Sequence, residues 1–155
     1  MSAPIAVPAG VVFALQAAVQ AEHRAIYGYG ALGPKLTGAQ AQLAFYAERA
    51  HRDQRDLASA RLRAVSVVPS PSAISYAVPV LAGAAAARRF ARRLEDGAAA
   101  AWRYVIVEAT AAPPTAVTRD IADTALTALT ASSVRAMRWA EIIDPAHPTV
   151  AFPGI

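Results

Sequence analysis

Four long helical segments, separated by breaks at proline and glycine, make up most of this sequence of 155 residues. Between the breaks, apolar residues recur at intervals of three and four, which is the period of an amphipathic helix. We expect helices over about residues 10–33, 38–64, 82–110 and 115–143. Alanine supports this assignment with 41 of the 155 residues, because it is the best helix former and lets helices pack closely. The sequence therefore predicts an all-α protein with one domain spanning residues 1–155.

The lengths of the connections constrain how these helices are arranged. About four residues join the first helix to the second and the third to the fourth, so each pair must be antiparallel neighbours. Residues 66–81 contain too much proline and serine for a helix. Extended, they reach about 50 Å, whereas a helix of about 26 residues is only about 39 Å long. We therefore expect a four-helix bundle in which a long crossover joins two antiparallel pairs, with a loose loop as the alternative.

Composition limits the classes of chemistry and of partner. The chain has no cysteine, which excludes disulfides and thiolate sites and fits a cytoplasmic location. Only 17% of its residues are charged, against about 25% in ordinary soluble domains. This low charge indicates surface covered by another subunit, so we expect a homodimer formed through alanine-rich faces. No segment is predicted to span a membrane, because prolines interrupt both long uncharged stretches.

A basic run at residues 88–93 (RRFARR) is the candidate surface for a protein partner. The net charge of +4 permits binding to an acidic partner there. We do not expect nucleic-acid binding, because no recognised motif or interleaved aromatic set accompanies the arginines. The extended tail expected over residues 144–155 carries three apolar side chains that we expect to cover an apolar seam: Val150, Phe152 and Ile155.

The first two helices carry polar residues on stripes that otherwise face the core. The stripe of the first helix comprises Val12, Leu15, Val19, Glu22, Ile26 and Tyr29. The stripe of the second comprises Ala44, Glu48, His51, Arg55, Ala58 and Leu62. Lys35 is near the centre of the turn between these two helices. Glu22 lies 13 residues before Lys35 and Glu48 lies 13 residues after it, so the two glutamates are level on antiparallel helices. We therefore expect Glu22, Glu48 and His51 to converge inside the bundle.

Two buried carboxylates need a cation, a shared proton or water, because an unpaired buried charge costs several kcal/mol. Carboxylate and imidazole together suit iron or manganese. Glu22 and the run Glu48-Arg49-Ala50-His51 resemble the ferritin-like di-metal carboxylate proteins, in which one helix gives a Glu and the next gives Glu-x-x-His. This resemblance implies a further ligand on the third helix, for which Glu95 is the candidate.

The fourth helix departs from the ferritin-like pattern, because neither Glu nor His occurs between Asp123 and Glu141. A symmetric di-iron site is therefore not expected. Three interpretations of the carboxylates stay open. They form a metal-free network with Arg55 or Arg135, they hold a single or lopsided metal site, or Glu22 or Glu48 faces solvent.

As a whole, the chain resembles an alanine-rich ferritin-like family of unassigned function from high-GC bacteria. The resemblance rests on the segments AEHRAIYGYGALG, LEDGAAAAW and FPGI. It implies a ferritin-like fold and leaves the activity unassigned. We predict a non-catalytic bundle with a degenerate carboxylate/His metal site and expect no cofactor. The alternative is an iron- or manganese-binding oxidase or iron-handling protein with Glu22, Glu48, His51 and Glu95 as ligands.

Overall fold

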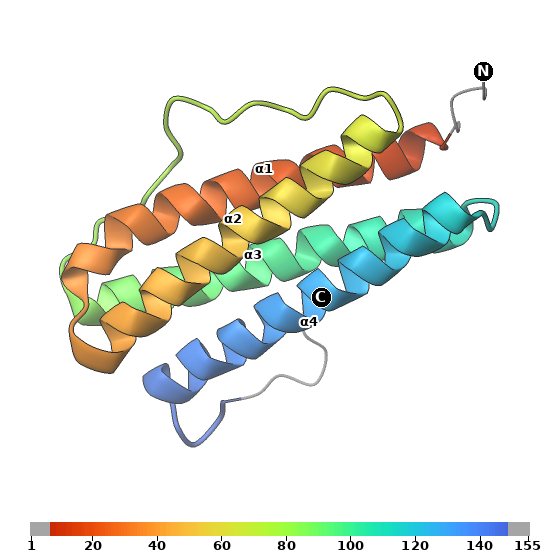
Figure 1. Cartoon of the computed structure of the whole chain (residues 1–155). Coiled ribbons are helices and arrows are strands. Elements are labelled where there is room, and N and C mark those ends of the chain that lie inside the picture. The colour runs from red at the N-terminus through yellow and green to blue at the C-terminus, as the bar shows by residue number, and fades with distance from the viewer. Residues whose placement is uncertain (1–6, 149–155) are drawn as a thin grey trace.

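The computed structural model describes residues 7–148, and it confirms an all-α four-helix bundle (Figure 1). The four helices and one short 3-10 turn are α1 (Ala9–Leu32), η1 (Gly33–Lys35), α2 (Gly38–Ala64), α3 (Ala84–Ala111) and α4 (Ala116–Ile143). The ends agree with the expected ranges to within two residues. The apolar tail residues Val150, Phe152 and Ile155 lie outside the described part of the chain.

The start of α4 shows how the sequence fixes a helix end. Pro113 and Pro114 interrupt the preceding helix, and Thr115 follows as the N-cap residue. The Thr115 hydroxyl accepts a hydrogen bond from the backbone N–H of Thr118 at 3.1 Å. The Thr118 hydroxyl in turn accepts from the backbone N–H of Thr115 at 2.9 Å. This reciprocal pair satisfies two backbone donors that the first turn of a helix leaves free.

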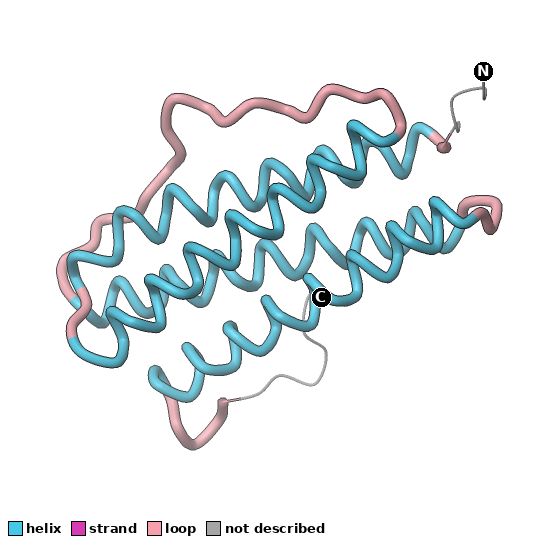
Figure 2. Tube along the Cα trace, viewed as in Figure 1, coloured by secondary structure: helices cyan, strands magenta, loops and turns pink. Residues whose placement is uncertain are grey.

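The helices form two antiparallel pairs, α1 with α2 and α3 with α4, and α1 also packs along α3. Helices α2 and α4 have few direct contacts with one another. The connection from α2 to α3 runs without regular structure along the length of the bundle, as the pink trace in Figure 2 shows. The Gln16 side chain holds this crossover to α1, because its Nε2 donates to the carbonyl of Val68 and its Oε1 accepts from the backbone N–H of Ser70.

The core consists of two apolar clusters. One surrounds Leu15, Trp102 and Ile121, and the other surrounds Leu32 and Trp139. Many of the alanines line the contacts between helices and are almost fully buried, as expected from their small volume. Within the described residues, no helix is both long enough and apolar enough to cross a membrane.

Candidate functional site

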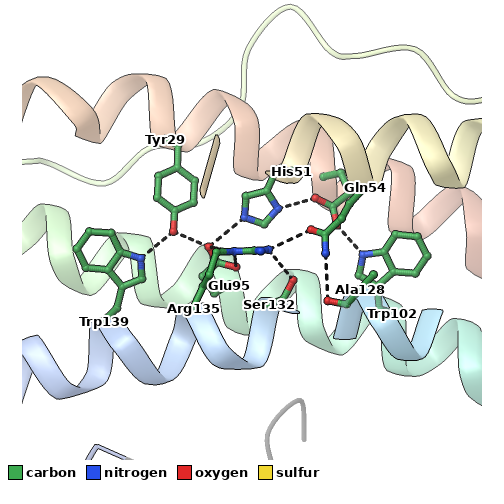
Figure 3. Close-up of polar contacts among 10 residues, drawn as sticks. Tyr29, His51, Gln54, Glu95, Trp102, Ala128, Ser132, Arg135 and Trp139 are labelled. Atoms are coloured by element: carbon green, nitrogen blue, oxygen red, sulfur yellow. Dashed lines mark hydrogen bonds and ion pairs between the residues drawn. The ribbon is translucent and has the colours of Figure 1, made fainter. Parts of the chain in front are cut away.

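A layer of buried polar side chains lies between the two apolar clusters, and all four helices contribute to it (Figure 3). Helix α1 supplies Glu22, α2 supplies His51 and α3 supplies Glu95, and all three residues have no solvent-exposed surface. Arg135 of α4 is 9% exposed. Charged residues are almost never buried to this extent unless they are paired, so the contacts among them decide what the layer can do.

His51 lies between the two glutamates. Its Nδ1 is 2.6 Å from Oε2 of Glu22, and its Nε2 is 3.1 Å from Oε1 of Glu95. A neutral imidazole has only one N–H, so both contacts are hydrogen bonds to carboxylates only when both nitrogens are protonated. Burial by itself lowers the pKa of His51, but the negative charge of Glu95 and the hydrogen bonds that the ring donates to both glutamates outweigh burial and raise that pKa from 6.5 to about 9. His51 is therefore an imidazolium cation at neutral pH.

Arg135 is the second cation of the layer. Its Nε lies 3.0 Å from each carboxylate oxygen of Glu95. Its Nη2 donates to Oε1 of Gln54 at 3.0 Å and to the hydroxyl of Ser132 at 3.1 Å. Burial raises the pKa of Glu95, but the charges of His51 and Arg135 outweigh this effect and hold the pKa below its usual value. Glu95 is therefore an ionised carboxylate shared by two cations.

Aromatic side chains donate the remaining hydrogen bonds to both carboxylates. The indole N–H of Trp102 donates to Oε1 of Glu22 at 2.6 Å, and the Tyr29 hydroxyl donates to Oε1 of Glu95 at 2.6 Å. The Tyr29 oxygen in turn accepts from the indole N–H of Trp139 at 2.8 Å. Burial and the adjacent Glu95 charge raise the pKa of Tyr29 well above its usual value, so this phenol stays protonated. Its ring also stacks on the His51 ring, with centroids 5.5 Å apart.

The charges of the layer balance, because two carboxylates face two cations. Every carboxylate oxygen of Glu22 and Glu95 also accepts a hydrogen bond. A metal ion would need a free lone pair on His51, whereas both ring nitrogens face carboxylates. It would also compete with Arg135 for both oxygens of Glu95. In the described part of the chain, no group of three or more His, Cys, Asp or Glu side chains is arranged to hold a metal ion. The residues as arranged therefore do not fit a metal centre.

Two of the expected site residues lie outside the layer. Glu48 is partly exposed and pairs along the surface of α2 with Arg52. Arg55 pairs with its neighbour Asp56 at the surface instead of with the central carboxylates. The buried face of α2 passes through Ala47 and Gln54, so Glu48 and Arg55, each one residue further along, are turned about 100° away from it. Of the three residues expected to converge inside the bundle, Glu22 and His51 do meet, whereas Glu48 lies at the surface.

Gln54 and Ser132 were not predicted from the sequence, although a weak signal exists for each. Gln54 stands three residues after His51, and Ser132 stands three residues before Arg135, so each shares a helix face with a core polar residue. Gln54 also donates to the carbonyl of Ala128 at 3.1 Å, which links α2 to α4.

Three of the four arginines in the basic run at residues 88–93 are held by neighbours. Arg88 donates to Gln40 at 2.8 Å, Arg92 lies 3.7 Å from Asp96, and Arg93 lies over the ring of Phe90. Arg89 is exposed. Docking of an acidic partner on this run stays a prediction.

Residues 14–155 match the family model described as a domain of unknown function, DUF4439. The chain belongs to this family. A solved structure similar to this DUF4439 chain is that of rv2844, a conserved hypothetical protein from Mycobacterium tuberculosis. The two share 35% sequence identity over 93% of this chain and 97% of that chain, with a TM-score of 0.78. Among curated proteins, none matched this DUF4439 sequence.

Proposed function

We propose that this chain is a single-domain, ferritin-like, non-catalytic bundle. In it, the side chains of His51 and Arg135 supply the positive charge that metal ions would supply beside the buried carboxylates. The observation that supports this most directly is the position of His51 between Glu22 and Glu95, with both ring nitrogens facing carboxylates. Arg135 supplies the second positive charge through both oxygens of Glu95. The ferritin-like metal site is degenerate in this interpretation, and its remaining carboxylates join four helices instead of binding an ion. The protein then acts as a rigid scaffold that self-associates as a dimer.

Metal content after anaerobic loading with Fe(II) or Mn(II) tests this proposal. We expect the wild-type protein, purified without a His tag, to retain no stoichiometric metal by elemental mass spectrometry. The two ring N–H protons of His51 should give slowly exchanging NMR signals at pH 7, because both are buried and hydrogen-bonded. Near-stoichiometric metal in the wild type, lost in Glu22→Ala/His51→Ala but kept in Glu48→Ala, would overturn the proposal. Glu48→Ala is the matched control because its carboxylate lies at the surface.

The alternative is a metal-binding oxidase or iron-handling protein, and the convergence of Glu22, His51 and Glu95 at one level of the bundle favours it. Such a protein would require His51 to lose a proton and Arg135 to leave Glu95. The Arg135→Ala variant separates the two functions. In the metal-free scaffold this variant stays metal-free and loses stability, whereas in a metal protein it gains metal affinity because a competing cation is gone.

A further inference from the structure

The outer face of α4 carries a surface stripe that is uncharged in the middle and charged at both ends. This α4 stripe comprises Arg119, Asp123, Leu126, Thr130, Val134, Met137 and Glu141. All seven residues are exposed, and intervals of three and four place them along one side of the helix. Three large apolar side chains lie in its middle part: Leu126 is 56% exposed, Val134 40% and Met137 41%. Helix α4 lies at the edge of the bundle in Figure 1.

The stripe is symmetric about Thr130, because its other members lie in pairs four, seven and eleven residues to either side. The Thr130 hydroxyl already donates to the carbonyl of Leu126 at 2.8 Å within the helix. Covering this position therefore leaves no unpaired donor, and the small side chain allows a second helix to approach closely. A symmetric stripe with a small residue at its centre suits a two-fold contact, in which the same surface is used by both copies.

Antiparallel pairing of two such stripes about Thr130 makes their charges complementary. Arg119 would lie opposite Glu141 of the second copy, at both ends of the contact. Leu126 would lie opposite Val134 of the second copy, and Asp123 would lie beside the segment that carries Met137 and Arg138 of the second copy. Within the described residues, Arg119, Asp123 and Glu141 have no side-chain ion pair of their own. Parallel pairing would instead place like charges together, which disfavours it.

We infer that the α4 stripe is the interface through which two copies of this chain associate, with the two α4 helices antiparallel and crossing at Thr130. This inference rests on the self-association proposed above, and it is independent of the charge state of the buried layer. It differs from the expected alanine-rich contact, because the α4 stripe itself contains no alanine.

A charge-reversal series tests the register by sedimentation equilibrium. Arg119→Glu places glutamate opposite Glu141 at both ends of the dimer, and we expect it to weaken dimerisation roughly tenfold at low salt. Arg119→Glu/Glu141→Arg restores opposite charges and should restore the wild-type dissociation constant. Equal weakening by the single and double variants would overturn the antiparallel pairing.

Two further variants test the contact itself. Leu126→Asp should give a monomer with unchanged helix content, because the residue is exposed in the single chain. Thr130→Cys should form a disulfide-linked dimer on mild oxidation, since the chain has no cysteine of its own, whereas Ala60→Cys on the exposed face of α2 should not.

The outcomes separate this inference from the proposed self-association. A dimer that persists unchanged in Leu126→Asp would retain self-association but reject the α4 stripe. A strict monomer in the wild type at high concentration would remove both. A wild-type monomer whose melting temperature falls in Leu126→Asp would mean that the chain's own residues cover the stripe.

Discussion

Trp102 and Trp139 donate their indole N–H groups to opposite ends of one hydrogen-bonded chain in the bundle core. Between them the chain passes through Glu22, His51, Glu95 and Tyr29 in turn. Each Trp belongs to one of the two apolar clusters, so the polar layer is sealed at both ends by large buried rings. The layer thereby links the two halves of the core, and loss of one member leaves buried partners unsatisfied.

Stability should fall as the pH rises through the pKa of His51. In the folded state this pKa is about 9, above its unfolded value near 6.5. The imidazolium therefore contributes stability that is fully present below pH 6.5 and is lost as the pH rises towards and past 9. We expect the melting temperature to decline over this window, as measured by circular dichroism. His51→Gln should flatten the decline, whereas His147→Gln, at an exposed position, should retain it. An equally steep decline in His51→Gln would contradict the assignment.

Arg135→Met should destabilise the fold strongly, because it leaves Glu95 with one cation instead of two inside the core. Removing one partner of a buried ion pair costs about 3–5 kcal/mol. For a chain of this size the loss corresponds to a fall of roughly 10 °C in melting temperature. Arg24→Met on the exposed face of α1 is the control and should change stability by less than about 0.5 kcal/mol.

A double-mutant cycle of Arg135→Met with Glu95→Gln measures the coupling directly. The combined loss should be clearly smaller than the sum of the two single losses, because each single variant already breaks the same pair. Additive losses would indicate that Arg135 and Glu95 do not depend on one another.

Tyr29→Phe should cost about 1–3 kcal/mol, because it removes the hydroxyl that accepts from Trp139 and donates to Glu95. The Trp139 indole N–H would then be buried without an acceptor. Chemical denaturation with the intrinsic tryptophan fluorescence as readout measures the loss. Tyr27→Phe is the matched control, because Tyr27 is exposed and its ring meets the Tyr76 ring in a T-shaped contact. Equal effects of the two variants would count against the bridging role of Tyr29.

Gly28→Ala should be destabilising and Gly30→Ala stabilising, although both glycines lie in α1. A Cβ atom at Gly28 would come within 2.5 Å of Cδ1 of Leu94, because α1 and α3 approach closely there. Such overpacking costs about 1–3 kcal/mol. A Cβ at Gly30 meets nothing within 4 Å, so the better helix propensity of alanine should add up to about 1 kcal/mol. Thermal unfolding of the two variants gives the comparison, and stabilisation by Gly28→Ala would refute the close contact.

Helix ends and connection lengths were predictable because they depend on local chemistry. Proline lacks a backbone donor, so Pro113 and Pro114 end one helix and residues 66–81 cannot form another. The apolar spacing of α1 likewise predicted Glu22 and Tyr29 in the core, and both are buried. On α3, Glu95, the residue that the resemblance singled out, is buried as well.

The sequence by itself thus determined the four helices, the crossover and the burial of Glu22 and Glu95. Tertiary structure decided which side of α2 enters the core. A period of 3.6 residues fits contacts at both i+3 and i+4, so Glu48 and Ala47 satisfied the pattern about equally well in the sequence. Packing against α1 selected Ala47 and His51 and left Glu48 at the surface beside Arg52. Only that rotation, together with the reach of Arg135 from α4, produced a layer in which His51 and Arg135 balance the two carboxylates.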